Sequence, residues 1–116
     1  MTTSMHTDQL PAAVRTYLAA QEARDADAAL RSFAPGAVVT DQGETFTGTD
    51  ELRRFVSDAG AEFTYTTTLT GARREDDGTW VVTQRLEGDF PGGVAVLDLR
   101  FVLEDDRVVR LDYVPA

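Results

Sequence analysis

The chain has 116 residues, 42% of them hydrophobic, which is enough for one domain with a core built around a single sheet. Twenty acidic against eleven basic residues give a net charge of -9, which disfavours nucleic acid and anionic membranes as partners. The absence of cysteine excludes disulfides and thiolate chemistry, and no apolar run approaches the ~20 residues that span a bilayer, so we expect a cytoplasmic protein.

The N-terminal segment offers little for catalysis. Residues 1–7 are polar, and we expect them to be a disordered tail of one domain that spans 1–116. The one histidine, His6, lies in this tail, so a Ser/His/Asp triad would need the tail to fold back onto a pocket. We expect no metal and no cofactor. Residues 76–78 lack the spacing of an EF-hand, and residues 92–93 precede a strand, not the helix N-terminus that binds phosphate.

Two short amphipathic helices are predicted next. The first has its apolar residues at a helical spacing, and Thr7 or Asp8 can cap its start. These apolar residues are Leu10, Ala13, Val14, Tyr17 and Leu18. Asp25 can cap the second helix, which we expect to end before residues 35–36, a Pro-Gly pair. The apolar residues of that helix are Ala26, Ala29, Leu30 and Phe33.

A strand pair and a third helix follow. Residues 37–41 alternate as a short strand, residues 42–43 turn it, and residues 44–47 return. Thr49 is placed to cap the third helix, which Gly60 is expected to end. The apolar residues of this helix are Leu52, Phe55, Val56 and Ala59.

The second half of the chain predicts four strands, at residues 62–74, 80–88, 94–103 and 107–114. Alternation predicts that one face of this antiparallel meander is apolar and packs on the helices. The inward residues are Phe63, Tyr65 and Leu69; Trp80, Val82 and Leu86; Leu97, Leu99, Phe101 and Leu103; and Val109, Leu111 and Tyr113. Helices first and strands last is typical of an α+β fold.

The opposite rows of three successive strands each carry an acid and an arginine two residues apart. These pairs are Arg85 with Glu87, Asp98 with Arg100, and Arg110 with Asp112. Neighbouring strands can pair such residues crosswise, so the outer face of the sheet is predicted to be a ladder of salt bridges.

The order of elements from Val14 to Phe55 resembles the opening of a cone-shaped α+β superfamily. That superfamily includes nuclear transport factor 2, SnoaL-like polyketide cyclases and ketosteroid isomerases. The resemblance implies a cystatin-like roll, in which a curved antiparallel sheet wraps around three helices and leaves an opening at one end. It also implies a small apolar metabolite as ligand, and a homodimer that forms through the polar outer face.

Tyr17 and Asp41 are the candidate catalytic pair. In the resemblance to ketosteroid isomerases, Tyr17 falls on the phenol that hydrogen-bonds a developing enolate oxygen, and Asp41 on the carboxylate that moves the proton. Proton abstraction beside a carbonyl needs such a base and such a donor. The alternative is structural, with Tyr17 as a core aromatic and Asp41 as a turn residue before Gln42 and Gly43.

A third member of that constellation is a protonated acid on a late strand, for which Asp98 is the nearest match. Alternation places Leu97 there instead and turns Asp98 to the opposite face, unless a bulge intervenes. The loop at 88–93, with Phe90 at its centre, is either a lid or an ordinary hairpin connection. The residues expected to line the pocket are Phe33, Phe55, Phe63, Tyr65, Trp80, Leu97 and Phe101.

A second constellation consists of Arg85, Glu87 and Asp112. These residues resemble the acid–arginine–acid set of limonene epoxide hydrolases, which activates water and protonates an epoxide. The chain departs from that family, with Glu87 in place of Asp, Asp41 in place of Asn, and Val39 in place of a strand-one tyrosine.

Three functions therefore remain open from the sequence. The first is cofactor-free proton transfer on an apolar carbonyl compound by Asp41 and Tyr17. The second is epoxide opening or cyclisation by the second constellation. The third is a non-catalytic ligand-binding or dimerisation module.

Overall fold

The computed structural model describes residues 9–58 and 61–116. Predictions made for His6, the tail at 1–7, the Thr7 or Asp8 cap, Ala59 and Gly60 lie outside these residues. The elements, in chain order, are α1 (Ala12–Ala23), α2 (Ala26–Ser32), β1 (Phe33–Asp41), β2 (Glu44–Thr47), α3 (Gly48–Asp58), β3 (Tyr65–Arg74), β4 (Trp80–Gly88), β5 (Val94–Glu104) and β6 (Arg107–Pro115). The predicted α+β fold class is confirmed.

The first two helices form a tight hairpin because the C-terminus of α1 and the N-terminus of α2 are both capped by nearby residues. Arg24 adopts a left-handed conformation (φ 52°) after α1, and its backbone N–H donates to the carbonyls of Ala20 and Gln21. Asp25 caps α2, as predicted, and its side chain accepts from the Ala28 N–H at 3.1 Å. The predicted end of α2 was late, because Phe33 is already extended and opens β1.

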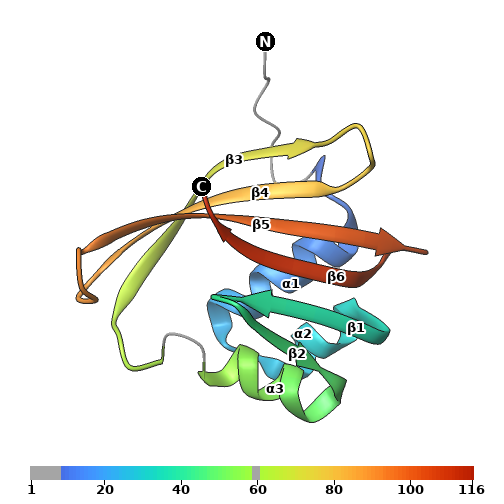
Figure 1. Ribbon diagram of the computed structural model, residues 1–116, viewed down its shortest axis with the longest axis horizontal. Helices are drawn as coiled ribbons and strands as arrows, with labels where there is room; N and C mark the ends of the chain where they lie inside the picture. The colour runs from blue at the N-terminus through green and yellow to red at the C-terminus, as the bar shows by residue number, and fades with distance from the viewer. Residues whose placement is uncertain (1–8, 59–60) are drawn as a thin grey trace.

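The six strands form one curved, open sheet in the order β2-β1-β6-β5-β4-β3, with α1 and α2 behind it in the view of Figure 1. The meander from β3 to β6 is antiparallel, as predicted. β1 joins β6 in parallel, so the first strand of the chain pairs with the last. This pairing brings residues that are more than 70 positions apart, such as Asp41 and Tyr113, into direct register.

The core lies between the helices and the inner face of the sheet. Its largest fully buried side chains are Tyr17, Phe101, Leu99, Leu111, Val14, Val39, Val82 and Val108; Val81 is equally buried but lies on the outer face. One inward assignment was wrong, since Val108 is fully buried whereas Val109 is partly exposed. A register shift between Val102 and Leu103 breaks the simple alternation of β6 at this point.

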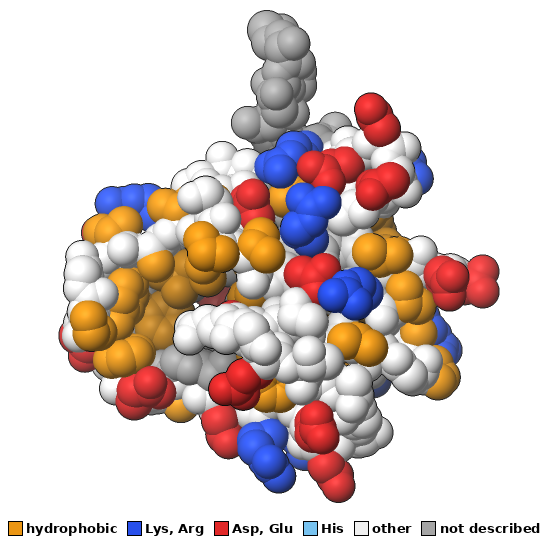
Figure 2. Space-filling model, in the orientation of Figure 1, with side chains coloured by type: hydrophobic (Ala, Val, Ile, Leu, Met, Phe, Trp, Pro, Cys, Tyr) orange, Lys and Arg blue, Asp and Glu red, His pale blue; other side chains and the backbone are white. Residues whose placement is uncertain are grey.

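The outer face of the sheet carries ion pairs, but among the described residues they do not form the predicted crosswise ladder. Arg85–Glu87 and Arg110–Asp112 each lie within one strand, and Asp98 and Arg100 pair with Arg73 and Glu75 instead. Figure 2 shows basic and acidic side chains alternating across this face. The pairs are Arg73 with Glu75 and Asp98, Arg100 with Glu75, Arg85 with Glu87, and Arg110 with Asp112. These groups are partly exposed, so each pair contributes little to stability. Among the described residues, no helix has the length and apolar character needed to cross a bilayer.

Candidate functional site

Asp41 is the last residue of β1 and lies on the inner face of the sheet. It pairs with Glu44 across the β1–β2 turn and with Tyr113 of β6 on its other side. The carboxylate is half-buried, and loss of hydration, followed by the nearby charge of Glu44, raises the pKa of Asp41 above its ordinary value. Asp41 is therefore a partly desolvated acid in register with Tyr113 on the inner face.

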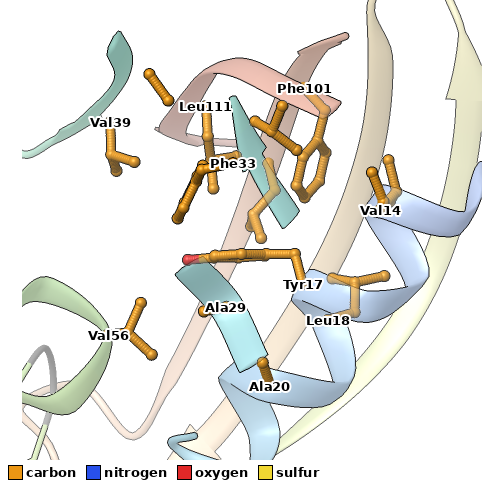
Figure 3. Packing of buried hydrophobic residues seen from close by; sticks show 14 of the residues in the cluster. Val14, Tyr17, Leu18, Ala20, Ala29, Phe33, Val39, Val56, Phe101 and Leu111 are labelled. Carbon is orange, nitrogen blue, oxygen red and sulfur yellow. The ribbon is translucent and has the colours of Figure 1, made fainter. Parts of the chain in front are cut away.

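Tyr17 belongs to α1, and its side chain extends from this helix into the core, where the residue is 1% exposed. Its ring makes edge contacts with Phe33 and Phe101, at centroid distances of 5.6 and 5.7 Å. Figure 3 shows its hydroxyl directed away from α1, towards the side where Val39 and Val56 lie. The Tyr17 and Tyr113 hydroxyl oxygens are 2.7 Å apart, a hydrogen bond between two phenols. Burial is the main cause that raises the pKa of both tyrosines.

Two glutamines extend this hydrogen-bonded pair into a chain. Gln21 Nε2 donates to the Tyr113 hydroxyl at 3.0 Å, and Gln84 Nε2 donates to Gln21 Oε1 at 2.9 Å. Gln84 is 3% exposed, although it lies on the apolar face of β4. The chain Gln84–Gln21–Tyr113–Tyr17 thus satisfies polar groups inside an otherwise apolar core.

Gln21, Gln84 and the hydroxyl of Tyr113 were not predicted as parts of the site. Two signals pointed to them. Gln21 is four residues after Tyr17 and therefore on the same face of α1. Gln84 is a polar residue in an inward row, where a buried amide requires partners.

Aromatic rings from α3 and β2 cover the other side of this hydrogen-bonded chain. Phe55 makes an edge contact with Tyr113 at 5.3 Å between centroids, and Phe46 contacts Phe55 at 4.8 Å. Of the expected lining residues, Phe55 therefore reaches the site directly. Phe33 and Phe101 support it from behind, because both contact the buried Tyr17 and Phe101 has no exposed area.

The other expected lining residues lie farther along the sheet. Trp80 is the first residue of β4, at the end away from the β4–β5 loop. The guanidinium carbon of Arg74 lies 5.4 Å from the centre of the Trp80 ring. Leu97 is half-buried on the inner face opposite Gln84. Figure 2 shows a hollow with a largely hydrophobic wall on the side of the molecule where β4 and β5 are joined. The arrowhead of β1, and hence Asp41, points to that same side in Figure 1.

Phe63, Tyr65 and Phe90 form an aromatic cluster at the joined end of β4 and β5. Phe90 packs against Phe63 and Tyr65, with ring centroids at 6.0 and 6.3 Å. Two hydrogen bonds connect Asp89 to Thr64, one through each backbone N–H, at 3.1 and 2.8 Å. These contacts attach the loop at 88–93 to the start of β3, where the three rings form a wall.

Arg24 holds the same wall to the end of α1. Its Nη2 donates to the Tyr65 hydroxyl at 3.0 Å, and its guanidinium lies 5.8 Å from the centre of the Tyr65 ring. Tyr65 is thus held from two sides, by Arg24 at the end of α1 and by Phe90 of the β4–β5 loop.

Asp98 is not brought to Asp41 and Tyr17. It lies on the outer face, where its carboxylate accepts from the Thr83 hydroxyl at 2.6 Å and pairs with Arg73 at 3.7 Å. Leu97 and Leu99 face inward on either side of it, as the alternation of β5 predicted. Asp98 therefore cannot complete an oxyanion site with Tyr17.

The second constellation is also not assembled. Arg85 pairs with Glu87 on the outer face, in register with Val96 of β5. Asp112 is in register with Arg100 of β5, which is four residues beyond Val96 on the same strand. The Asp112 carboxylate accepts from the Thr40 hydroxyl and pairs with Arg110. The expectation that these three groups share one site was wrong, because the strands separate them along the outer face.

Comparison with known proteins agrees with this architecture. Residues 14–112 match the family model of the SnoaL-like domain, and no curated protein matches the chain. A predicted polyketide cyclase from Sinorhizobium meliloti has a similar structure, with a TM-score of 0.83 and 29% identity over 94% of this chain and 99% of that one.

Two further solved structures share the fold at lower identity. A protein with a ketosteroid isomerase-like fold from Catenulispora acidiphila, in complex with trimethylamine, is 18% identical, with a TM-score of 0.74 over 90% of this chain and 85% of that one. A predicted ketosteroid isomerase from Kribbella flavida is also 18% identical, with a TM-score of 0.73 over 91% and 76%. The match over residues 14–112 of 116 shows that the chain belongs to the SnoaL-like domain family.

Proposed function

We propose that the protein binds a small, largely apolar carbonyl compound and transfers a proton on it without a cofactor. Asp41 is the base, and the Tyr17–Tyr113 phenol pair supplies the hydrogen-bond donor for the carbonyl oxygen. The observation that carries this proposal is the direct register of Asp41 with Tyr113, whose hydroxyl lies 2.7 Å from that of Tyr17.

The reaction that suits these groups is isomerisation of a β,γ-unsaturated ketone. Asp41 takes the proton from the α-carbon, the C–H electrons move towards the carbonyl, and a phenol donates a hydrogen bond to the enolate oxygen. The protonated Asp41 then returns the proton to the γ-carbon, which leaves the conjugated enone. Atoms and charge balance over the cycle, so no further reactant is needed.

The character of the site favours a neutral ligand with an apolar body. Phe46 and Phe55 supply aromatic surface beside Tyr113, and the nearby ionisable group is an acid in a chain of net charge -9. An anionic ligand would meet repulsion from Asp41 and Glu44. The likeness to a predicted polyketide cyclase and a predicted ketosteroid isomerase supports a carbonyl compound as the ligand class.

Two small ketones test this function directly. We expect wild-type protein to convert 3-cyclohexen-1-one to 2-cyclohexen-1-one, followed by the ultraviolet absorption of the conjugated product, and to bind the product in ligand-observed NMR. Cyclohexene, which lacks the acceptor oxygen, is the matched control and should bind more weakly. Binding without turnover would support a non-catalytic ligand-binding module, and absence of both would contradict the proposal.

We also propose a homodimer through the outer face of the sheet. Val94, Val96 and Val102 are 47%, 39% and 37% exposed there, and alternating acids and arginines can complement a second copy. A stable interface buries about 1,000 Å² or more in total. We expect a dimer in sedimentation at micromolar concentration, weakened by Val96→Asp. Wild-type protein that stays monomeric in both low and high salt would contradict it.

A further inference from the structure

The two phenols of the site differ in how much of their surface is accessible. Tyr17 is 1% exposed and is enclosed by Phe33 and Phe101. Tyr113 keeps part of its residue surface exposed and is in register with Asp41 on the neighbouring strand. The residue beside the base is therefore Tyr113, whereas Tyr17 lies behind it.

The amides of the chain determine what the Tyr113 oxygen does. Gln84 Nε2 donates to Gln21 Oε1, so Gln21 presents its Nε2 to Tyr113. An N–H group can only donate, and the Tyr113 oxygen is therefore an acceptor in this contact. The proton of the Tyr113 hydroxyl has to point elsewhere.

Among the residues that the structure describes, one phenolic proton has no protein acceptor. Tyr17 and Tyr113 carry one hydroxyl proton each, and their mutual hydrogen bond uses one of the two. Within residues 9–58 and 61–116, neither phenol has another hydrogen-bond partner besides Gln21. Either Tyr17 or Tyr113 therefore holds a proton that a ligand can accept.

The exposed surface of the two tyrosine residues favours one of these arrangements. If Tyr113 donated to Tyr17, the remaining proton would sit on a side chain that is almost fully buried, which costs free energy because a buried donor needs a partner. If Tyr17 donates to Tyr113, the remaining proton sits on the more accessible tyrosine, next to Asp41.

We infer that Tyr113, and not Tyr17, donates the hydrogen bond to the ligand oxygen. Tyr17 and Gln21 are then positioning residues that both donate to the Tyr113 oxygen, and Gln84 fixes the orientation of Gln21. Two hydrogen bonds received by Tyr113 polarise its O–H and make it a stronger donor as negative charge develops on an enolate. The role of Tyr113 towards a ligand rests on the proposed function. The direction of the hydrogen bond between Tyr17 and Tyr113 is independent of that function.

The ligand-facing donor is identified by the carbonyl band of bound 2-cyclohexen-1-one, labelled with carbon-13 at the carbonyl and measured by infrared difference spectroscopy. In Tyr113→Phe the band should return to the position of the free ketone in an apolar solvent, and isomerisation should fall about 10²- to 10³-fold. In Tyr17→Phe the band should keep most of its shift, and the rate should fall by about tenfold or less. A shift lost in Tyr17→Phe but kept in Tyr113→Phe would overturn the inference.

The direction of the hydrogen bond is measured on the unliganded protein by proton NMR. We expect one slowly exchanging hydroxyl proton, with nuclear Overhauser contacts to the Tyr17 ring, that disappears in Tyr17→Phe. It should persist in Tyr65→Phe, which removes the third tyrosine hydroxyl of the chain. Assignment of this proton to Tyr113 would overturn the inference. If no ketone binds, the proposed function and the ligand-facing role fail together, while this spectrum still decides the direction of the bond.

Discussion

Replacing Asp41 by asparagine should lower the rate of 3-cyclohexen-1-one isomerisation about 10²- to 10⁴-fold, the contribution expected of a positioned general base. Asparagine keeps the size of the side chain but cannot accept the proton. The fold should persist, because the asparagine carries no charge into a partly desolvated position. Urea denaturation should show a free energy of unfolding at neutral pH that equals or exceeds that of the wild type.

The sign of this stability effect follows from the raised pKa of Asp41. In the folded protein the carboxyl holds its proton more tightly than in the unfolded chain, so the ionised form costs stability at pH values above that pKa. The base works only when ionised, and activity should therefore rise with pH through the raised pKa. Glu44→Gln removes one cause of the raised Asp41 pKa, so the midpoint of the pH–activity curve should move to lower pH.

Glu87→Gln is the matched control for Asp41→Asn. It also neutralises one carboxylate, but on the outer face, where Glu87 is 55% exposed and paired with Arg85. This variant should keep wild-type activity. An Asp41→Asn protein as active as the wild type, or a Glu87→Gln protein without activity, would contradict the role assigned to Asp41.

The fold was predictable because its signals are local. Helical spacing in α1, the Asp25 cap and the alternation of β4 and β5 each specify one element, and together they specify an α+β arrangement. The same alternation turned Asp98 to the outer face, as the structure has it. The bulge in β6 escaped prediction, because one extra residue shifts the inward row without any change in composition.

The candidate site was only half predictable because its contacts are not local. Tyr17 and Asp41 were identified through a resemblance, whereas Tyr113 enters the site only because β1 pairs in parallel with β6. The hydrogen bond between Gln21 and Gln84 joins positions 63 apart, and no periodicity encodes it. The opposite error has the same origin, since Arg85 and Asp112 match a motif that the register of β5 keeps apart.

Gly88 provides the second prediction, which concerns the wall at the joined end of β4 and β5. A Cβ atom at this position would overlap the Thr64 carbonyl oxygen and the Tyr65 Cβ, and would lie 2.7 Å from the Tyr65 Cα. These are mostly backbone atoms, so β3 has to move away as a unit. Gly88→Ala should therefore lower the free energy of unfolding by about 1–3 kcal/mol, measured by urea denaturation.

Gly71→Ala is the matched control, because Gly71 is also a strand glycine and its added Cβ would meet nothing closer than Thr83 at 4.0 Å. Its free energy of unfolding should change by less than about 1 kcal/mol. Equal stability of the two variants would show that β3 does not approach Gly88 as closely as described. The movement of β3 in Gly88→Ala should also separate Tyr65 from Arg24 and Phe90, because Tyr65 contacts both residues and lies next to the added Cβ. Weaker ketone binding in Gly88→Ala, with binding retained in Gly71→Ala, would then link this wall to the ligand site.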